Sequence, residues 1–250
     1  MPTATPLLLI GAGAVGRMHI ERCLRHPGVQ LLGVADPGDI GRAMAEAAGL
    51  RWFADHHDAL TALRPAAAII ATPNSSHVPI AMACMDRGVA VLLEKPVADQ
   101  VSDAERLIAH KALTGVPVLV GHQRRHNPIL RRARDLVEGG LLGRPVAATV
   151  MATWLKPASY FEPSWRRSAG AGAGPVLINL THDIDMLLWL LGDVVEVQAM
   201  ASSALRGFDV EDTAAATLRV SSGALGSLIV SDTAVSPWHW DLAAGEAAHY

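Results

Sequence analysis

The sequence predicts an α/β fold, with an N-terminal doubly wound parallel sheet and a C-terminal α+β domain that carries a mostly antiparallel open sheet. Up to residue 121, short and almost wholly apolar runs alternate with helical patterns, which is typical of parallel strands buried on both faces. Beyond residue 121, apolar runs follow one another more closely, and a Ser-Ser-Gly hairpin signal joins the last pair. We therefore expect one domain over 1–121 and a second over 122–250.

A glycine-spaced turn follows the first apolar run, 7–10, and is typical of a dinucleotide-binding Rossmann domain. Its first glycine allows a tight turn, the second lets the backbone approach a pyrophosphate, and the third lets the next helix pack against the strand. That helix would direct its unpaired N–H groups at the anion. Glycines also serve ordinary turns, but strand, triplet, helix, strand and acid in this order favour nucleotide binding. The residues assigned to this part of the cofactor site are Gly11, Gly13, Ala14, Val15 and Gly16.

The second strand, 29–35, is followed directly by Asp36, close to the offset of roughly 20 residues expected for a ribose-binding acid. Its carboxylate would accept hydrogen bonds from the adenosine ribose and repel a 2′-phosphate. Pro37 and Gly38 come next and offer that phosphate no cationic or hydroxyl partner. We therefore expect NAD rather than NADP. The alternative is an aspartate that only caps a turn.

The remaining elements of the first domain follow in order. We expect a helix at 40–49, strands at 52–54 and 66–71, a helix from the 72–77 turn to 88, a strand at 89–93, a helix at 102–114 and a strand at 116–121. His56 and His57 are interpreted as surface or helix-capping residues, and no metal site is expected. Loops at the carboxyl ends of parallel strands bind ligands, so the cofactor site should also include Thr72, Pro73, Asn74, His77, Glu94 and Lys95.

The second domain begins with a helix at 128–138, whose charged outer faces indicate a solvated surface. After it we expect a strand at 146–153, a short flexible loop at 169–174, a helix at 175–191 and strands at 194–202, 214–220, 224–232 and 239–243.

Lys95 is a candidate catalytic residue because it stands at the end of a buried strand, between Glu94 and Pro96. A lysine there could hydrogen-bond a substrate hydroxyl, and desolvation would lower its pKa toward a value suited to proton transfer. The alternative is a simple Glu-Lys pair at a strand end, which contributes little. Its position at the expected nicotinamide end favours catalysis.

The helix at 175–191 carries a second candidate, His182. Asn179 and His182 lie on one face of a helix that is otherwise largely apolar, where polar groups are unfavourable unless they are hydrogen-bonded. A lone core histidine is more often structural than catalytic. Here the helix follows a glycine-rich loop and an aromatic, polar segment, so we favour a general base with an ordinary pKa of about 6.5.

Polar and aromatic residues lie in the sequence between Lys95 and His182, and further polar residues lie on the helix at 175–191. Aromatic rings interleaved with cations fit a pocket for a polyhydroxylated or carboxylated molecule, and the arginines favour an acid or a phosphate-bearing sugar. The same mixture is typical of subunit contacts, and the sequence does not separate the two. The residues assigned to substrate are Gln123, Arg124, Trp154, Tyr160, Trp165, Arg166, Asn179 and Asp185, with Lys156 in the same segment.

Composition narrows the class of protein. The chain has 250 residues, of which 50% are hydrophobic and 18% charged, as expected for a core-rich globular protein. Its net charge of -3 gives no indication of a nucleic-acid partner. Cys23 and Cys84 lie in apolar helical patterns, which favours free thiols in a reducing compartment. No signal peptide or membrane span is predicted, so we expect a cytoplasmic protein without a membrane partner.

Five motifs together resemble the glucose-fructose oxidoreductase and inositol dehydrogenase family, Gfo/Idh/MocA, over essentially the whole chain. They are Gly11-x-Gly13-x-x-Gly16-x-x-His19, Ala71-Thr72-Pro73-Asn74-Ser75-Ser76-His77, Glu94-Lys95-Pro96, Arg124-Arg125-x-x-Pro128, and Gly172-x-Gly174 with His182-x-x-Asp185 and Trp189-Leu190-Leu191-Gly192.

The resemblance implies NAD(P)-dependent hydride transfer to or from the hydroxyl carbon of a sugar, polyol or related hydroxy acid. In this family Lys95 and His182 match the usual catalytic pair. The family's open sheet often serves oligomer formation, so the resemblance also implies a homo-oligomer, a dimer or a tetramer.

Two departures from the family pattern matter. Many members have an aspartate four residues before the histidine, where this chain has Ile178. The alternative function is therefore a catalytically silent NAD-binding sensor or regulator. Members also usually run some tens of residues longer, so the chain is either truncated or a compact variant.

Overall fold

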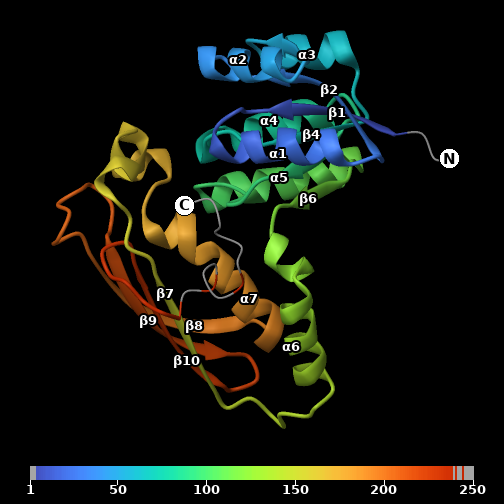
Figure 1. Ribbon diagram of the computed structural model, residues 1–250. Helices are drawn as coiled ribbons and strands as arrows, with labels where there is room; N and C mark the ends of the chain where they lie inside the picture. Colours follow the sequence, from blue (N-terminus) through green and yellow to red (C-terminus); the bar gives the residue numbers. More distant parts are fainter. Residues whose placement is uncertain (1–3, 239, 241–243, 245–250) are drawn as a thin grey trace. The chain divides into compact units, whose positions relative to one another are not determined.

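The computed structural model describes residues 4–238, 240 and 244, which fall into two compact units divided between Gly121 and His122 (Figure 1). Each unit is described by itself. Within the described residues, no helix is both long enough and apolar enough to cross a membrane.

The first unit is built on a six-stranded sheet in which every strand pair is parallel, as predicted. The strand order is β3-β2-β1-β4-β5-β6, so the direction of winding reverses between β1 and β4. In doubly wound sheets this switch point opens the crevice in which ligands bind. The strands are β1 (Thr5–Ile10), β2 (Val29–Ala35), β3 (Arg51–Phe53), β4 (Ala67–Ile70), β5 (Ala90–Leu93) and β6 (Val118–Val120).

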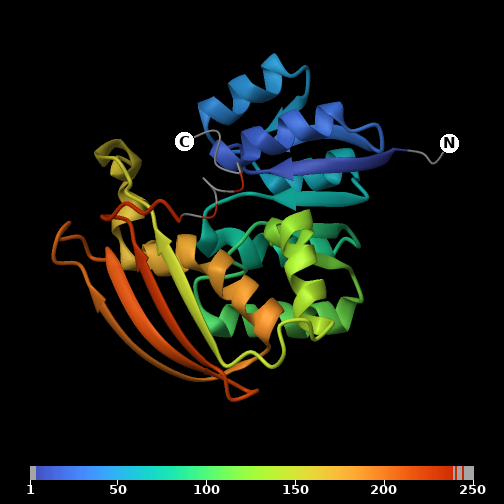
Figure 2. The same cartoon turned by 60° about the horizontal axis from the view of Figure 1, so that its bottom comes forward.

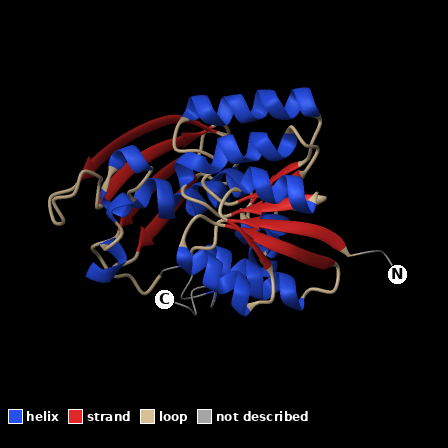
Figure 3. Ribbon diagram, turned by 90° about the horizontal axis from the view of Figure 1, so that it is seen from above, coloured by secondary structure: helices blue, strands red, loops and turns tan. Residues whose placement is uncertain are grey.

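Helices cover both faces of this sheet (Figure 3). Successive side chains of β1 point to opposite faces, so Leu9 packs with α1 and α2 whereas Leu8 and Ile10 pack with α3, α4 and α5. Strand β1 is therefore buried on both faces, which explains its continuous apolar run. The helices are α1 (Ala14–Arg25), α2 (Asp39–Ala47), α3 (His56–Leu63), α4 (His77–Met85) and α5 (Val101–Thr114).

Helix α3 is an element that the sequence analysis did not predict. Its N-terminus is capped by Asp55, whose carboxylate accepts the backbone N–H groups of His57 and Asp58. His56 and His57 therefore occupy the first turn of the helix and do not cap it, and His57 is exposed, as the surface interpretation expects.

The second unit contains a four-stranded mixed sheet in the order β7-β10-β9-β8. Strand β10 is antiparallel to β9 and parallel to β7, and β9 is antiparallel to β8. Gly223, with φ +90°, closes the hairpin predicted between the last two strands. The strands are β7 (Ala147–Thr153), β8 (Val194–Ser202), β9 (Thr213–Val220) and β10 (Leu225–Ser231).

One face of this sheet is covered and the other is open (Figure 2). Leu180, at the start of the long helical segment, packs against Ala214, Leu228 and Val230 on the covered face. On the open face, a cross-strand row of Met151, Ile229, Ala215 and Met200 is exposed to solvent, with Met200 82% exposed.

The helical segment predicted at 175–191 is not a uniform α-helix. Val176–Leu180 is π-helical, and α7 (Thr181–Leu191) follows it. A π-turn is wider than an α-turn, so the one-face spacing expected for Asn179 and His182 does not hold over its first part. Helix α6 (Pro128–Glu138) is as predicted.

Short 3₁₀ turns lie in the connecting segments of both units. The loop expected at 169–174 contains one of them. The strand expected at 239–243 lies outside the described residues, except for Trp240. The 3₁₀ turns are η1 (Asn74–Ser76), η2 (Gln123–His126), η3 (Ala158–Phe161), η4 (Ser164–Arg167) and η5 (Ala169–Ala171).

Candidate functional site

The turn between β1 and α1 has room for an anion at its second glycine. Gly11 has φ +92°, and a Cβ there would lie 2.5 Å from the carbonyl oxygen of Ala71. A Cβ on Gly16 would collide with the carbonyl of Gly11, whereas a Cβ on Gly13 would meet nothing described within 4 Å. Gly11 and Gly16 are therefore required by packing.

Helix α1 begins beside that open space. Gly13 and Ala14 are exposed, Val15 is half-buried, and within the described chain no side chain caps the helix. The N–H groups of the first turn and the positive end of the helix dipole remain available for a phosphate. The five residues assigned to the phosphate turn thus fit the pyrophosphate of a dinucleotide.

The Asp36 carboxylate is held next to this turn. Oδ2 accepts the backbone N–H of Ala12 at 2.7 Å, and Oδ1 accepts the backbone N–H of Gly38 at 2.8 Å. A Cβ on Gly41 would lie 2.5 Å from the Asp36 Cγ, so only glycine leaves room for the carboxylate there. Asp36 therefore does cap the turn that follows it, which was the alternative to ribose binding. Each oxygen nevertheless keeps a lone pair for a ribose hydroxyl.

The loop after β4 is joined to the loop after β5 by a buried histidine. His77 is 1% exposed; its Nδ1 lies 2.7 Å from the carbonyl oxygen of Pro96, and its Nε2 lies 2.9 Å from that of Thr72. Burial lowers the pKa of His77, and the two carbonyls and nearby Glu94 oppose that shift without overcoming it. Thr72 also accepts a hydrogen bond from Ser76, Pro73 is exposed and Asn74 is buried.

Glu94 and Lys95 directly follow β5. The Glu94 Oε1 lies 2.8 Å from His19 Nε2 on α1, and its Oε2 accepts the backbone N–H of Lys95 at 3.3 Å. Burial alone would raise the pKa of Glu94, but the His19 hydrogen bond and the charges of His19 and Lys95 outweigh it and lower the pKa. Lys95 is half-buried.

In the second unit, an arginine from η2 clamps an aspartate of α7. Asp185 is buried and accepts Arg125 Nε at 2.8 Å and Arg125 Nη2 at 2.5 Å, a bidentate pair. This hydrogen bonding raises the pKa of Arg125. Nδ1 of His122 lies 3.6 Å from Asp185 Oδ2, and its ring meets the His182 ring edge-on with centroids 6.5 Å apart.

Two more predicted residues lie on these same elements. Arg124 is buried and donates from Nη1 to Asp183 at 3.2 Å, while Gln123 is exposed at the start of η2. Asn179 is half-buried within the π-turn. The structure thus brings Arg124, Asp185 and His182 to one cluster between η2 and α7.

In the aromatic segment that follows β7, lysine and arginine side chains lie over aromatic rings of the same segment. Lys156 Nζ lies 3.0 Å from the Trp154 ring centroid and 5.1 Å from that of Tyr160. The Arg166 guanidinium lies 4.0 Å from the Tyr160 centroid and 5.3 Å from that of Trp165. These cation–π contacts order the segment.

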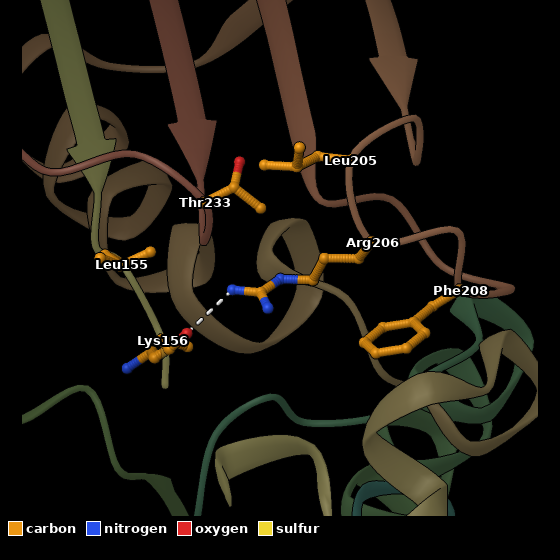
Figure 4. Close-up of a pocket in the computed structure, with 6 residues that line it drawn as sticks. All are labelled: Leu155, Lys156, Leu205, Arg206, Phe208 and Thr233. Carbon is orange, nitrogen blue, oxygen red and sulfur yellow. Dashed lines mark hydrogen bonds between the residues drawn. The ribbon is translucent and has the colours of Figure 1, made fainter. Parts of the chain in front are cut away.

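A pocket of about 290 Å³ lies at one end of the mixed sheet (Figure 4). Arg206 reaches across it, donating from Nη2 to the Lys156 carbonyl at 3.0 Å and from Nε to Asp232 at 2.6 Å. Burial raises the pKa of Asp232, and Arg206 opposes that shift. The lining residues are Leu155, Lys156, Leu205, Arg206, Phe208 and Thr233.

Two family descriptions match nearly the whole chain. "Oxidoreductase family, NAD-binding Rossmann fold" matches residues 6–122, and "GFO/IDH/MocA C-terminal domain" matches residues 130–245. The chain belongs to the Gfo/Idh/MocA oxidoreductase family. Its first unit is therefore the NAD-binding Rossmann domain of that family, as expected from the glycine turn.

The chain is also similar in sequence and structure to individual dehydrogenases. An inositol 2-dehydrogenase from Rubrobacter xylanophilus is 32% identical over 228 residues, which are 88% of this chain and 62% of the relative. A myo-inositol 2-dehydrogenase from Thermotoga maritima is 27% identical, over 91% of this chain and 68% of the relative. The solved WlbA dehydrogenase from Bordetella pertussis, in complex with NADH and UDP-GlcNAcA, has a TM-score of 0.89 and 29% identity, over 92% of this chain and 72% of that chain.

The chain covers less than two thirds of the length of several relatives. It spans 62%, 64% and 56% of three curated proteins that it matches.

Three parts of the candidate site were not predicted from sequence. The sequence indicates His19 only as a motif position, and it gives no functional signal for His122 or Arg206. Their partners Glu94, Asp185 and Asp232 lie far away in the chain, so no local spacing indicates these pairs. Within the described residues, no group of three or more His, Cys, Asp or Glu side chains could hold a metal ion.

Proposed function

We propose that this chain acts as an NAD-dependent dehydrogenase on the CH–OH group of a sugar, polyol or related hydroxy acid. The observation that carries the proposal is the uncapped N-terminus of α1, with open space at Gly13 beside the Asp36 carboxylate. NAD, when bound, supplies a two-electron acceptor for a hydride from the alcohol carbon.

NAD is favoured over NADP because of the charge at position 36. Oδ1 and Oδ2 of Asp36 are fixed by two backbone N–H groups, so the carboxylate cannot easily turn away from a 2′-phosphate. The cofactor residues proposed are those of the phosphate turn, Asp36 and the strand-end loops with Thr72, Pro73 and Asn74.

Lys95 and His182 are the proposed catalytic residues, one in each unit. Lys95 would donate a hydrogen bond to the substrate oxygen and stabilise the charge that develops on it. His182 would take the hydroxyl proton as general base. The proposed substrate-binding residues include Trp154, Tyr160 and Trp165. The cation–π contacts of Lys156 and Arg166 support this role, because they hold aromatic rings of this segment in fixed positions.

The polar side chains of the second unit indicate the chemical class of the substrate. Gln123, Arg124, Asn179 and Asp185 supply hydrogen-bonding groups of both kinds near His182 in the fold of the second unit. Such a mixture suits a polyhydroxylated ligand. The relatives named inositol 2-dehydrogenase support the same class.

The deciding experiment is turnover of NAD with a panel of polyols, sugars and hydroxy acids, followed at 340 nm. Wild-type protein should reduce NAD with at least one of them, and Lys95→Ala should lose most of that rate. Tight NADH binding without turnover across the panel would instead support a silent sensor, the alternative that Ile178 suggests.

We also propose a homo-oligomer that forms through the open face of the mixed sheet. The exposed row of Met151, Ile229 and Met200 supports this, because monomeric proteins rarely leave a contiguous apolar row in solvent. A cytoplasmic location is proposed on the ground that Cys23 and Cys84 are both free and buried.

A further inference from the structure

His77 is one of the most buried polar side chains of the first unit, and both of its ring nitrogens face main-chain oxygens. Only 1% of the residue is exposed, so the ring has almost no surface to offer a ligand. The carbonyl oxygens of Thr72 and Pro96, which lie at hydrogen-bond distance, belong to different loops, and a neutral imidazole donates its single N–H to one of them. The side chain therefore acts on the backbone around it.

The two loops joined by His77 are the ones that follow β4 and β5, at the ligand-binding edge of the sheet. Thr72 begins the loop assigned to the cofactor, and Pro96 immediately follows Lys95. The amide on the other side of Lys95 is also held, because its N–H donates to Glu94, which in turn contacts His19. The backbone is therefore held on both sides of the Lys95 side chain, at its own N–H and at the carbonyl of Pro96.

We propose that His77 is a positioning residue that holds Lys95 in register with the cofactor loop. The inference rests on the function proposed above for Lys95. A lysine side chain has four rotatable bonds, so the place of its ammonium group depends first on where its Cα is anchored. His77, in the first turn of α4, supplies that anchor when its Nδ1–H donates to the carbonyl oxygen of Pro96. Displacements of about 1 Å at a reacting group can lower rates roughly 100-fold.

A double-mutant cycle tests the dependence on Lys95. His77→Gln, whose amide can still donate, and His77→Phe, which only fills the space, are each made alone and with Lys95→Met. We expect kcat to fall about 10-fold for His77→Gln and about 100-fold for His77→Phe, while the Kd for NADH changes less than threefold. In the Lys95→Met background the same changes should have almost no further effect on kcat.

Equal losses of kcat with and without Lys95 would overturn the proposal, because His77 would then act independently of Lys95. Rates are expressed per NADH-binding site, measured by calorimetry, so that partly unfolded protein does not imitate the effect. His57→Gln, on the exposed first turn of α3, is the matched control and should leave kcat and the Kd unchanged.

A second measurement needs no turnover, and so separates this proposal from the proposed function. The chain has three lysines, Lys95, Lys111 and Lys156, so protein labelled with ¹³C at the lysine Cε gives three assignable signals. We expect the relaxation order parameter of Lys95 to fall in His77→Gln while that of Lys111 stays the same. An unchanged order parameter for Lys95 would overturn the anchor even if the wild-type protein proves inactive.

Discussion

The Asp36 carboxylate accepts the backbone N–H of Ala12 at 2.7 Å, which ties the end of β2 to the phosphate-binding turn. This single hydrogen bond fixes the position of the proposed ribose-binding carboxylate relative to the proposed pyrophosphate-binding turn.

Asp36→Ala should weaken NAD binding by about 10- to 100-fold, because a hydrogen bond to a charged group contributes roughly 1.5–3 kcal/mol. The Kd for NADP should change less or improve, since the repulsive charge is gone. Calorimetry with both cofactors measures the two values. A variant that still prefers NAD by the wild-type ratio would contradict the specificity role of Asp36.

The two glycines of the α1 turn should respond in opposite ways. Gly16→Ala should lower the free energy of unfolding by about 1–3 kcal/mol because its methyl group has no space beside Gly11. Gly13→Ala should leave stability within about 1 kcal/mol but weaken NAD binding, since its methyl group points into the open space. Urea unfolding and calorimetry check the pair. Unchanged NAD binding in Gly13→Ala would be inconsistent with an anion site at Gly13.

Glu94 should make the first unit sensitive to acid. Its folded-state pKa lies below the ordinary value of 4.5, although burial alone would raise it, because His19 and Lys95 favour the ionised form. The stabilisation is complete above pH 4.5 and is lost as the pH falls through the lower, folded-state pKa. Urea unfolding of wild type and Glu94→Gln from pH 7 to pH 3 should show a difference that shrinks at the acid end. A constant difference would exclude this linkage.

Arg206 and Asp232 should behave as a buried pair. Arg206→Met should cost about 3–5 kcal/mol of stability because it leaves a buried carboxylate without its partner. Adding Asp232→Asn should restore part of the loss. The control is Arg219→Met, whose partner Glu196 is 51% exposed and whose loss should be within about 1 kcal/mol.

The open sheet face should control the oligomeric state. Ile229→Lys places a charge in the centre of the exposed row, opposite Met151 and Ala215. Light scattering after size exclusion should change from a dimer or tetramer to a monomer, with NAD binding retained. A wild-type protein that is already monomeric would refute this interface.

The sequence predicted most of the sheet elements because their signals are local. Strands β2 and β8 have the predicted bounds, since apolar runs and glycine turns mark their ends. Helix α3 was missed because its His-His-Asp start reads as polar, and the Asp55 cap alone did not indicate a helix. The π-turn before α7 also escaped, because it arises from the way the segment packs and leaves the apolar pattern unchanged.

In the candidate site, too, local features were predictable and long-range contacts were not. Single residues such as Asp36 and Lys95 could be selected because they directly follow buried strands. Their supporting contacts could not, because Glu94 finds His19 and Arg125 finds Asp185 only after the chain has folded. Sequence reasoning therefore identified candidate groups and left their orientation to the tertiary structure.

The parallel pairing of β7 with β10 has a consequence for synthesis on the ribosome. Thr149 meets Ser227, which lies 78 residues later in the chain, so β7 waits for its neighbour throughout that interval. At about 5–20 residues per second the delay is several seconds. During it, β7 has no backbone partner, and nascent chains of this protein should need chaperone protection most at that stage.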